Sequence, residues 1–192
     1  MNETARPFWE TKPLEEMNAT EWESLCDGCA RCCLLKLEDE DTREVFFTNV
    51  VCRYLDQEQC RCTEYADRNR LVPDCVLVTP EIARQHWLPD TCAYRLLSEG
   101  KPLTAWHPLV SGDRDSVFSA GIAVRDRVVS EEYVHPDELV EHLIHWDEDE
   151  EMTELPRRGR RGDWDEDATV VERVETGLLG YLIVKEGSRR GQ

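Results

Sequence analysis

All nine cysteines of this chain fall between Cys26 and Cys92, and four of them stand almost side by side. The run reads Cys26-Asp-Gly-Cys29-Ala-Arg-Cys32-Cys33. Thiolates at such short spacing can converge on one ion or cluster, because sulfur is the soft ligand that zinc and iron–sulfur centres select. The run therefore predicts a metal site, with these four cysteines as its first candidate ligands.

Length and composition indicate how the cysteines should be interpreted. The chain has 192 residues, enough for one domain with an appendage, so small size does not require a metal staple. No apolar stretch is long enough to cross a membrane, and the first residues do not follow the pattern of a signal sequence. We therefore expect a cytoplasmic protein without a membrane partner. In a reducing compartment, clustered cysteines are more often metal-binding or catalytic than disulfide-bonded.

Charge narrows the range of partners. Acidic side chains number 41 against 23 basic ones, which gives a net charge of −18. A net negative field repels phosphates, and no basic stripe interleaved with aromatic residues is present, so we expect no nucleic-acid partner. The same field attracts cations, which fits a metal ion as the partner. No feature of the sequence identifies a protein partner.

The remaining cysteines extend the predicted set of metal ligands. Thiols outside the run are either further ligands or small core residues, since cysteine is often buried as a hydrophobe. We include four of them as ligands, namely Cys52, Cys60, Cys62 and Cys75. Cys92 is the weakest candidate. Nine thiols could fill two four-ligand sites with one left over, or hold one cluster beside structural cysteines.

Histidine and aspartate offer weaker candidates for the same site. His107 could be a ligand, but a single histidine is more often a surface or capping residue. His142 and His145 could share one edge of a helix, although a solvated polar face is the simpler interpretation. Asp27 and Asp74 each adjoin a cysteine, where they could accept hydrogen bonds or bind the metal, but turn formation is favoured for both.

Local patterns predict short helices and a small sheet. Thr20 followed by Glu23 has the spacing of a capping box, so a short helix should lead into the cysteine run, with Gly28 favouring a loop partway through. Residues 45–51 are β-branched and aromatic and predict a buried strand. Thr79-Pro80 opens another helix, and residues 92–100 predict one closed by glycine.

The second half of the chain has less regular patterns. Residues 117–134 alternate apolar and charged side chains like a strand, and residues 135–146 have the pattern of an amphipathic helix. These signals give an α+β fold class with short helices around a small sheet, pinned by the metal site. We expect this cysteine-rich domain to span residues 1–148. Residues 149–192 form an acidic and arginine-rich extension, partly disordered, in which 170–184 is either a hairpin or a short helix.

The run Cys26-x2-Cys29-x2-Cys32-Cys33 resembles the signature of the CxxCxxCC, or YkgJ-type, family of zinc- or iron-chelating proteins. Further segments look like its bacterial YcgN-like subgroup of uncharacterised proteins, over roughly residues 7 to 148: Phe8-Trp9, Leu14-Glu-Glu-Met17, Glu21-Trp-Glu-Ser-Leu-Cys-Asp-Gly-Cys29, Phe47-Thr-Asn49, Pro73-Asp-Cys75, Trp87-Leu-Pro89, Thr91-Cys-Ala-Tyr-Arg-Leu-Leu97 and Trp106-His-Pro-Leu109. The resemblance implies a small bacterial chelator of zinc or iron with no reaction attached. The charged extension departs from that pattern.

Three functions remain open on this basis. The first is a non-catalytic chelator of zinc or iron, which the cysteine run and the acidic body favour. The second is an iron–sulfur protein in electron transfer or redox catalysis, because three local cysteines and a distant one also hold four-iron clusters. The third is thiol redox catalysis, which lacks its usual strand-then-helix context here. No catalytic motif is recognisable, so we do not expect an enzyme.

Overall fold

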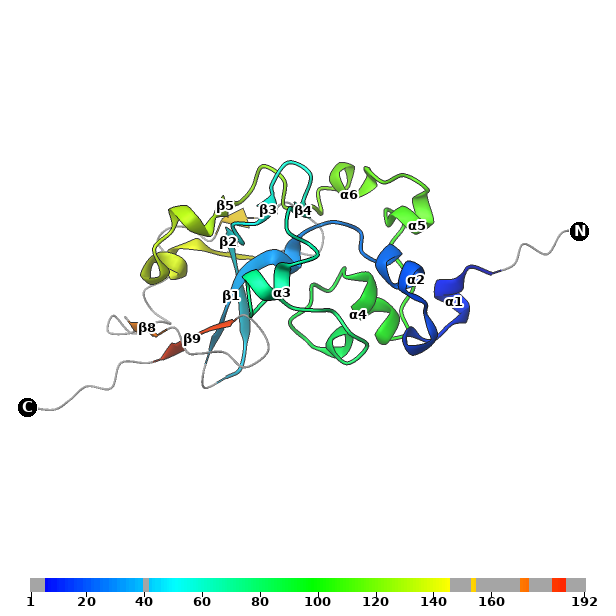
Figure 1. Cartoon of the computed structure of the whole chain (residues 1–192), viewed down its shortest axis with the longest axis horizontal. Coiled ribbons are helices and arrows are strands. Elements are labelled where there is room, and N and C mark those ends of the chain that lie inside the picture. The colour runs from blue at the N-terminus through cyan, green and yellow to red at the C-terminus, as the bar shows by residue number, and fades with distance from the viewer. Residues whose placement is uncertain (1–5, 40–41, 146–152, 155–169, 173–180, 186–192) are drawn as a thin grey trace, which may run out of the picture. The chain divides into compact units, whose positions relative to one another are not determined.

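The computed structural model describes residues 6–39, 42–145, 153–154, 170–172 and 181–185 (Figure 1). The chain divides into two compact units. Unit 1 comprises Met1–Cys32 and Leu77–Ala123, and unit 2 comprises Cys33–Val76 and Val124–Gln192. The first border between them falls inside the cysteine run, directly after Cys32.

Unit 1 is built from short helices. Within the described part of this unit no helix exceeds six residues, so helix stability comes from packing rather than from helix propensity. In chain order they are α1 (Phe8–Thr11), the 3₁₀ helix η1 (Leu14–Glu16), α2 (Ala19–Ser24), η3 (Ile82–Arg84), α4 (Ala93–Ser98), α5 (Pro108–Ser111) and α6 (Ser116–Ser119). A further 3₁₀ turn, η2 (Arg31–Cys33), lies at the border with unit 2.

The core of unit 1 gathers residues from both of its chain segments. Its buried members come from the helices and the loops that join them: Leu14, Leu25, Ala83, Ala93, Tyr94 and Leu103. Phe8, Trp22 and Cys92 are partly buried and pack against this cluster. The core therefore places the segment that leads into the cysteine run beside the segment that contains Cys92.

Helix α2 confirms the predicted helix before the cysteines, but its cap differs from the prediction. The cap residue is Asn18, whose side chain accepts from the Glu21 amide at 3.0 Å, while the Glu21 carboxylate accepts from the Asn18 amide at 3.0 Å. The prediction that Thr20 and Glu23 form the box was wrong. Two boxes of similar spacing overlap here, and asparagine is at least as good a cap as threonine.

Unit 2 contains a mixed sheet. Among the described residues its order is β7-β6-β2-β1-β9-β8, with β5 also paired to β2. The strands are β1 (Leu34–Asp39), β2 (Val45–Val51), β5 (Val129–Ser130), β6 (Leu143–His145), β7 (Thr153–Glu154), β8 (Val170–Glu172) and β9 (Tyr181–Lys185). A separate two-stranded hairpin joins β3 (Leu55–Asp56) to β4 (Arg61–Cys62). Strand β2 confirms the strand predicted at 45–51.

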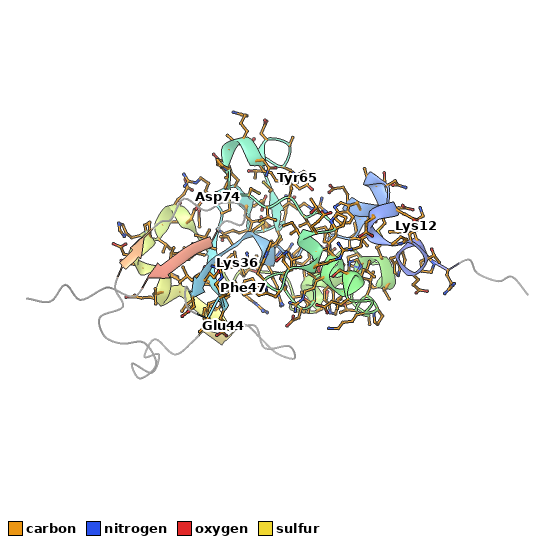
Figure 2. All side chains as sticks on the ribbon, turned by 90° about the horizontal axis from the view of Figure 1, so that it is seen from below. Lys12, Lys36, Glu44, Phe47, Tyr65 and Asp74 are labelled. Atoms are coloured by element: carbon orange, nitrogen blue, oxygen red, sulfur yellow. The ribbon has the colours of Figure 1, made fainter. Side chains whose placement is uncertain are left out.

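Strands β1 and β2 form the antiparallel centre of the sheet. Leu37, Val50 and Leu139 form its buried cluster, and Lys36 pairs with Phe47 across the two strands. The Lys36 ammonium lies 5.2 Å from the centre of the Phe47 ring, which is within cation–π range. Both residues are labelled in Figure 2. Burial of Lys36 is thus compatible with its charge.

Two predictions for the second half of the chain were wrong. Residues 117–134 hold α6, turns and only the two-residue strand β5, because left-handed backbone at Gly121 and Asp126 interrupts any extended run. Residues 135–146 do not form one helix. A 3₁₀ helix, η5 (Pro136–His142), follows the 3₁₀ turn η4 (Glu131–Tyr133), and pairing of β6 with β2 overrides the helical pattern afterwards.

The region after residue 148 contributes three described strands. Strand β8 pairs with β9 antiparallel, and β9 pairs with β1 parallel, so the hairpin alternative for 170–184 agrees with the strand pairing. The domain border at 148/149 stays a prediction. The α+β class with short helices and a small sheet is confirmed, and α3 (Arg68–Leu71) completes its elements. In the part of the chain that the structure describes, no helix is both long and apolar enough to span a membrane.

Candidate metal centre

The cysteine run starts from a fixed point in unit 1. Helix α2 ends at Ser24, and the next residue, Leu25, is fully buried. The imidazole of His107, 1 % exposed, donates from Nε2 to the Leu25 carbonyl at 3.0 Å. Its Nδ1 accepts from the Leu109 amide at 3.2 Å, which leaves Nε2 as the donor to Leu25. His107 therefore anchors the backbone one residue before Cys26.

A strained loop carries the first two cysteines. Gly28 and Ala30 both adopt left-handed backbone, with φ of 78° and 59°. A non-glycine residue in this region costs roughly 1–2 kcal/mol, and such strain is often found at functional sites. Asp27 Oδ1 accepts from the Cys29 amide at 2.9 Å and closes the turn. The loop thus places Cys26 and Cys29 at two corners of one tight turn.

Helix α4 brings Cys92 to the same place. Cys92 is the N-cap of α4, and Tyr94 in its first turn donates from its hydroxyl to the Trp22 carbonyl at 2.9 Å. The rings of Trp22 and Tyr94 lie 4.8 Å apart. Since Trp22 belongs to α2, these contacts join the start of α4 to the helix that leads into the cysteine run. Cys92, the weakest candidate from the sequence, is therefore a neighbour of the run.

The groups that shift the pKa of each thiol indicate which cysteines lie near one another. Burial raises the pKa of Cys29 well above its usual range, with further rises from Asp27 and the thiols of Cys32 and Cys26. Burial raises the pKa of Cys92 to about 12, and Asp27 and Cys32 add to that rise. Surrounding protein also raises the pKa of Cys26, although the residue as a whole reaches solvent, and Cys32, Asp27 and Cys92 raise it further. We define thiol set A as Cys26, Cys29, Cys32 and Cys92.

Backbone amides point at three thiols of set A. The Gly28 amide lowers the pKa of Cys26, the Arg31 amide that of Cys29, and the Arg95 and Tyr94 amides that of Cys92, each opposing the larger effect of burial. An amide two or three residues after the thiol favours the thiolate, which is the form that binds metals. The local backbone is therefore arranged to support thiolate ligands.

Asp27 provides a test of whether a cation fits here. Its Oδ2 atom is buried without a hydrogen-bond partner, while its charge acts on Cys26, Cys29 and Cys92. A buried carboxylate oxygen beside several thiols is costly unless a positive charge balances it. The four sulfur donors and this unpartnered oxygen are the chemistry that zinc or iron requires. The donor set therefore fits such an ion.

The thiols of set A are neighbours and not an assembled coordination shell. Among the residues the structure describes, no three His, Cys, Asp or Glu side chains are placed so that they could hold a metal ion. All nine cysteines are thiols, and none of them forms a disulfide. Binding would therefore need the thiols to turn toward one point.

Other predicted ligands lie in unit 2. The Cys52 amide donates to the Cys33 carbonyl at 3.2 Å, and the Cys62 thiol is among the groups that raise the pKa of Cys52, after burial and Glu131. Cys33, Cys52 and Cys62 are each partly buried. The predicted set of eight ligands is thus shared between the two units, with Cys33 on the opposite side of the border from Cys32.

Cys60 and Cys75 have different surroundings. Cys60 is buried with left-handed backbone, and its thiol donates to the Gln57 carbonyl at 3.7 Å. Burial raises its pKa, and the amides of Arg125 and Val124 and the Arg125 charge lower it, with no cysteine among the largest effects. The Cys75 carbonyl accepts from Asn69 Nδ2 at 2.7 Å. Ligation by either residue stays a prediction.

The three histidine candidates also lie in different surroundings. Both ring nitrogens of His107 bind backbone groups, so its position is structural and the capping interpretation is favoured. His142 Nδ1 lies 2.7 Å from Asn49 Oδ1 in unit 2, at the end of η5. His145 lies in β6, so the two do not share a helix edge. The sequence signal for His107 was its place before Pro108, which is typical of a helix cap.

Comparison with known proteins identifies the family of this chain. The CxxCxxCC family, described as "Putative zinc- or iron-chelating domain", matches residues 25–93. A UPF0260 protein of Cellvibrio japonicus is 55% identical over 142 residues, covering 73% of this chain and 97% of that protein. The chain belongs to the UPF0260 family. A UPF0260 protein of Gluconobacter oxydans is also 55% identical, over 147 residues, covering 76% of this chain and 89% of the relative.

A third UPF0260 relative, from Marinobacter nauticus, is 55% identical over 141 residues and covers 73% of this chain and 95% of its own. No solved structure gives a significant match. The matched family segment begins one residue before Cys26 and ends one residue after Cys92, so it includes every cysteine of the chain. The family expected from the cysteine spacing is thereby confirmed.

Proposed function

We propose that this protein chelates a zinc or iron ion through thiol set A. The observation that carries the proposal is the electrostatic effect that Cys92 shares with Cys26 and Cys32, which lie sixty or more positions earlier in the sequence. Four sulfur donors from two chain segments suit a closed tetrahedral site, which is the usual form of a structural zinc centre. The role is chelation, and no reaction is assigned to it.

The residues around set A have separate roles in this proposal. His107 and the α2–α4 contacts hold the two segments together, so the thiols lose little freedom when they converge. The amides of Gly28, Arg31 and Arg95 favour thiolates, and Asp27 adds negative charge. A bound cation would supply the positive charge that makes four thiolates stable beside each other.

Proton release is part of the proposed binding. The pKa values of Cys26, Cys29 and Cys92 are raised, so these side chains are protonated thiols at neutral pH without metal. Each must lose its proton to become a ligand. Metal affinity should therefore rise with pH over the neutral range, as protons compete less effectively for sulfur.

An iron–sulfur cluster is the second candidate, and one observation favours it. Three local cysteines joined by one remote cysteine is the pattern that holds four-iron clusters in ferredoxins, and Cys92 supplies the remote thiol. The same four residues serve both candidates. They differ in metal, acid-labile sulfide and colour, so one purification separates them.

The test is the metal content of the full chain, purified anaerobically, beside variants that each lack one thiol. Zinc, iron and sulfide per chain are measured for the unmodified protein, for Cys29→Ser and Cys92→Ser, and for Cys60→Ser as the matched control. We expect bound zinc or iron in the unmodified protein and in Cys60→Ser, and loss of at least one equivalent in the other two. Sulfide equal to iron, with a brown colour, would select the cluster.

Two results would overturn the proposal. One is an unmodified chain without zinc or iron even after reconstitution under reducing conditions. The other is a Cys92→Ser protein that keeps the full metal content and the same affinity, because set A then lacks its remote ligand.

A further inference from the structure

The backbone of unit 2 brings three more cysteines together. Leu34 at the start of β1 pairs with Val51 at the end of β2 in an antiparallel ladder. Cys33 is the last residue of η2 and precedes Leu34, Cys52 follows Val51, and the Cys52 amide donates to the Cys33 carbonyl at 3.2 Å. This backbone hydrogen bond holds the two cysteines next to each other at the end of the β1–β2 pair.

A tight hairpin adds Cys62 to this pair. The Leu55 amide donates to the Cys52 carbonyl at 2.9 Å, so the chain turns immediately after β2. Leu55 in β3 then pairs with Cys62 in β4, and the Thr63 amide donates to the Tyr54 carbonyl at 2.8 Å. The direct electrostatic effect of Cys62 on Cys52 agrees with that closeness.

We propose that Cys33, Cys52 and Cys62 bind a second metal ion of the soft, thiolate-preferring class, in unit 2 and without any ligand of set A. The proposal rests on the proposed chelating function and adds a separate site to it. Adjacent cysteines thereby have different partners, since Cys32 belongs to set A and Cys33 to the new site. A comparable split occurs in two-cluster ferredoxins, where the fourth cysteine of a local run ligates the other cluster.

Unit 2 contains two more cysteines, Cys60 and Cys75, which have different roles in this proposal. The Cys60 thiol donates to the Gln57 carbonyl, and its largest electrostatic neighbours are Arg125 and Asp56 rather than a thiol. The proposed second site therefore does not include Cys60, and Cys60→Ser is the control for the substitutions. Cys75 lies in the same unit and is the thiol that could complete four sulfur ligands.

The test is the binding stoichiometry of cobalt(II), the probe used, in the reduced full chain after removal of bound metal. Cobalt(II)–thiolate charge-transfer absorption counts the thiolate sites directly. We expect two equivalents for the unmodified chain and for Cys60→Ser, and one equivalent for a Cys52→Ser/Cys62→Ser variant. A Cys26→Ser/Cys29→Ser variant should also retain one.

The outcomes separate this inference from the proposed function. If Cys52→Ser/Cys62→Ser binds as much cobalt as the unmodified chain, the second site is refuted while set A stands. If Cys26→Ser/Cys29→Ser binds as much as the unmodified chain, set A fails instead. Cys62→Ser alone, at a partly exposed hairpin position, covers the case in which the double variant does not fold, and it should lose the same equivalent in native mass spectra.

Discussion

Asp27 is the residue whose environment most needs a cation. One carboxylate oxygen closes the turn to the Cys29 amide, and the other is buried without a partner among thiols. We predict that Asp27→Asn weakens metal binding about 10- to 100-fold, the usual effect of losing a charged group next to the ligands. Competition against a coloured chelator measures the affinity.

Asp115→Asn is the control for that prediction. Asp115 is an exposed carboxylate of unit 1, at the start of α6, and its side chain makes no cap hydrogen bond. Its replacement should leave the metal affinity unchanged. Equal affinities for the Asp27→Asn and unmodified proteins would mean that the orphaned oxygen has no part in the site.

His107 should act on stability rather than on metal content. His107→Ala removes a fully buried ring and leaves the Leu25 carbonyl and the Leu109 amide without their partners. We expect the free energy of unfolding to fall by about 2–4 kcal/mol, with the metal stoichiometry of the folded protein unchanged. Urea unfolding followed by tryptophan fluorescence measures the first quantity. The exposed His86→Ala is the control and should change stability by less than about 0.5 kcal/mol.

At the scale of elements, the capping of α2 determines where the cysteine run begins. Asn18→Ala removes the side-chain acceptor for the Glu21 amide and should lower the free energy of unfolding by about 1 kcal/mol. Thr20→Ala, at an exposed position inside the helix, should cost less than about 0.5 kcal/mol. Chemical unfolding of both variants compares them. A larger loss for Thr20→Ala would show that the box lies where the sequence first indicated.

The elements that sequence patterns predicted well are those with a local cause. The β-branched run at 45–51 forms β2 as predicted, and α4 begins at Ala93 with Gly100 in left-handed backbone just after it. Residues 135–146 were predicted wrongly because pairing of Leu143 and Ile144 with β2 is a long-range effect. Helical spacing of apolar residues says nothing about such pairing.

The candidate site also combines features with a local sequence signal and features that depend on long-range contacts. Spacing alone predicted Cys26, Cys29, Cys32 and Cys33 as candidate ligands, because their closeness in the sequence is local. The place of Cys92 depends on the contact of Tyr94 with Trp22 and on the shared core, neither of which has a local signal. The separation of Cys32 from Cys33 into different units likewise has no signal in the run itself.

For the whole molecule, buried thiols link stability to pH. Burial raises the pKa of Cys26, Cys29 and Cys92 in the folded chain above the value of about 8.5 that unfolded cysteine has. Above that pH the unfolded chain loses these protons and the folded chain keeps them, so unfolding becomes easier. The metal-free protein should therefore lose stability from about pH 8 upward.

The metal-loaded protein should respond in the opposite sense. Its folded state holds thiolates, so protons compete with the metal and stability falls as the pH is lowered. The urea concentration at the midpoint of unfolding, measured for both forms between about pH 6 and pH 9.5, tests this difference. The upper limit keeps the measurement below the usual pKa of lysine. Parallel pH profiles for the two forms would contradict ligation by these thiols.

The net charge of −18 is a property of the whole chain that supports cation binding without giving it specificity. Specificity must come from the donor atoms, and the central claim is that these are sulfur. X-ray absorption of the bound metal in the full chain tests it most directly. We predict a shell made of sulfur alone, at about 2.3 Å if the metal is zinc. A shell dominated by nitrogen or oxygen would contradict the account.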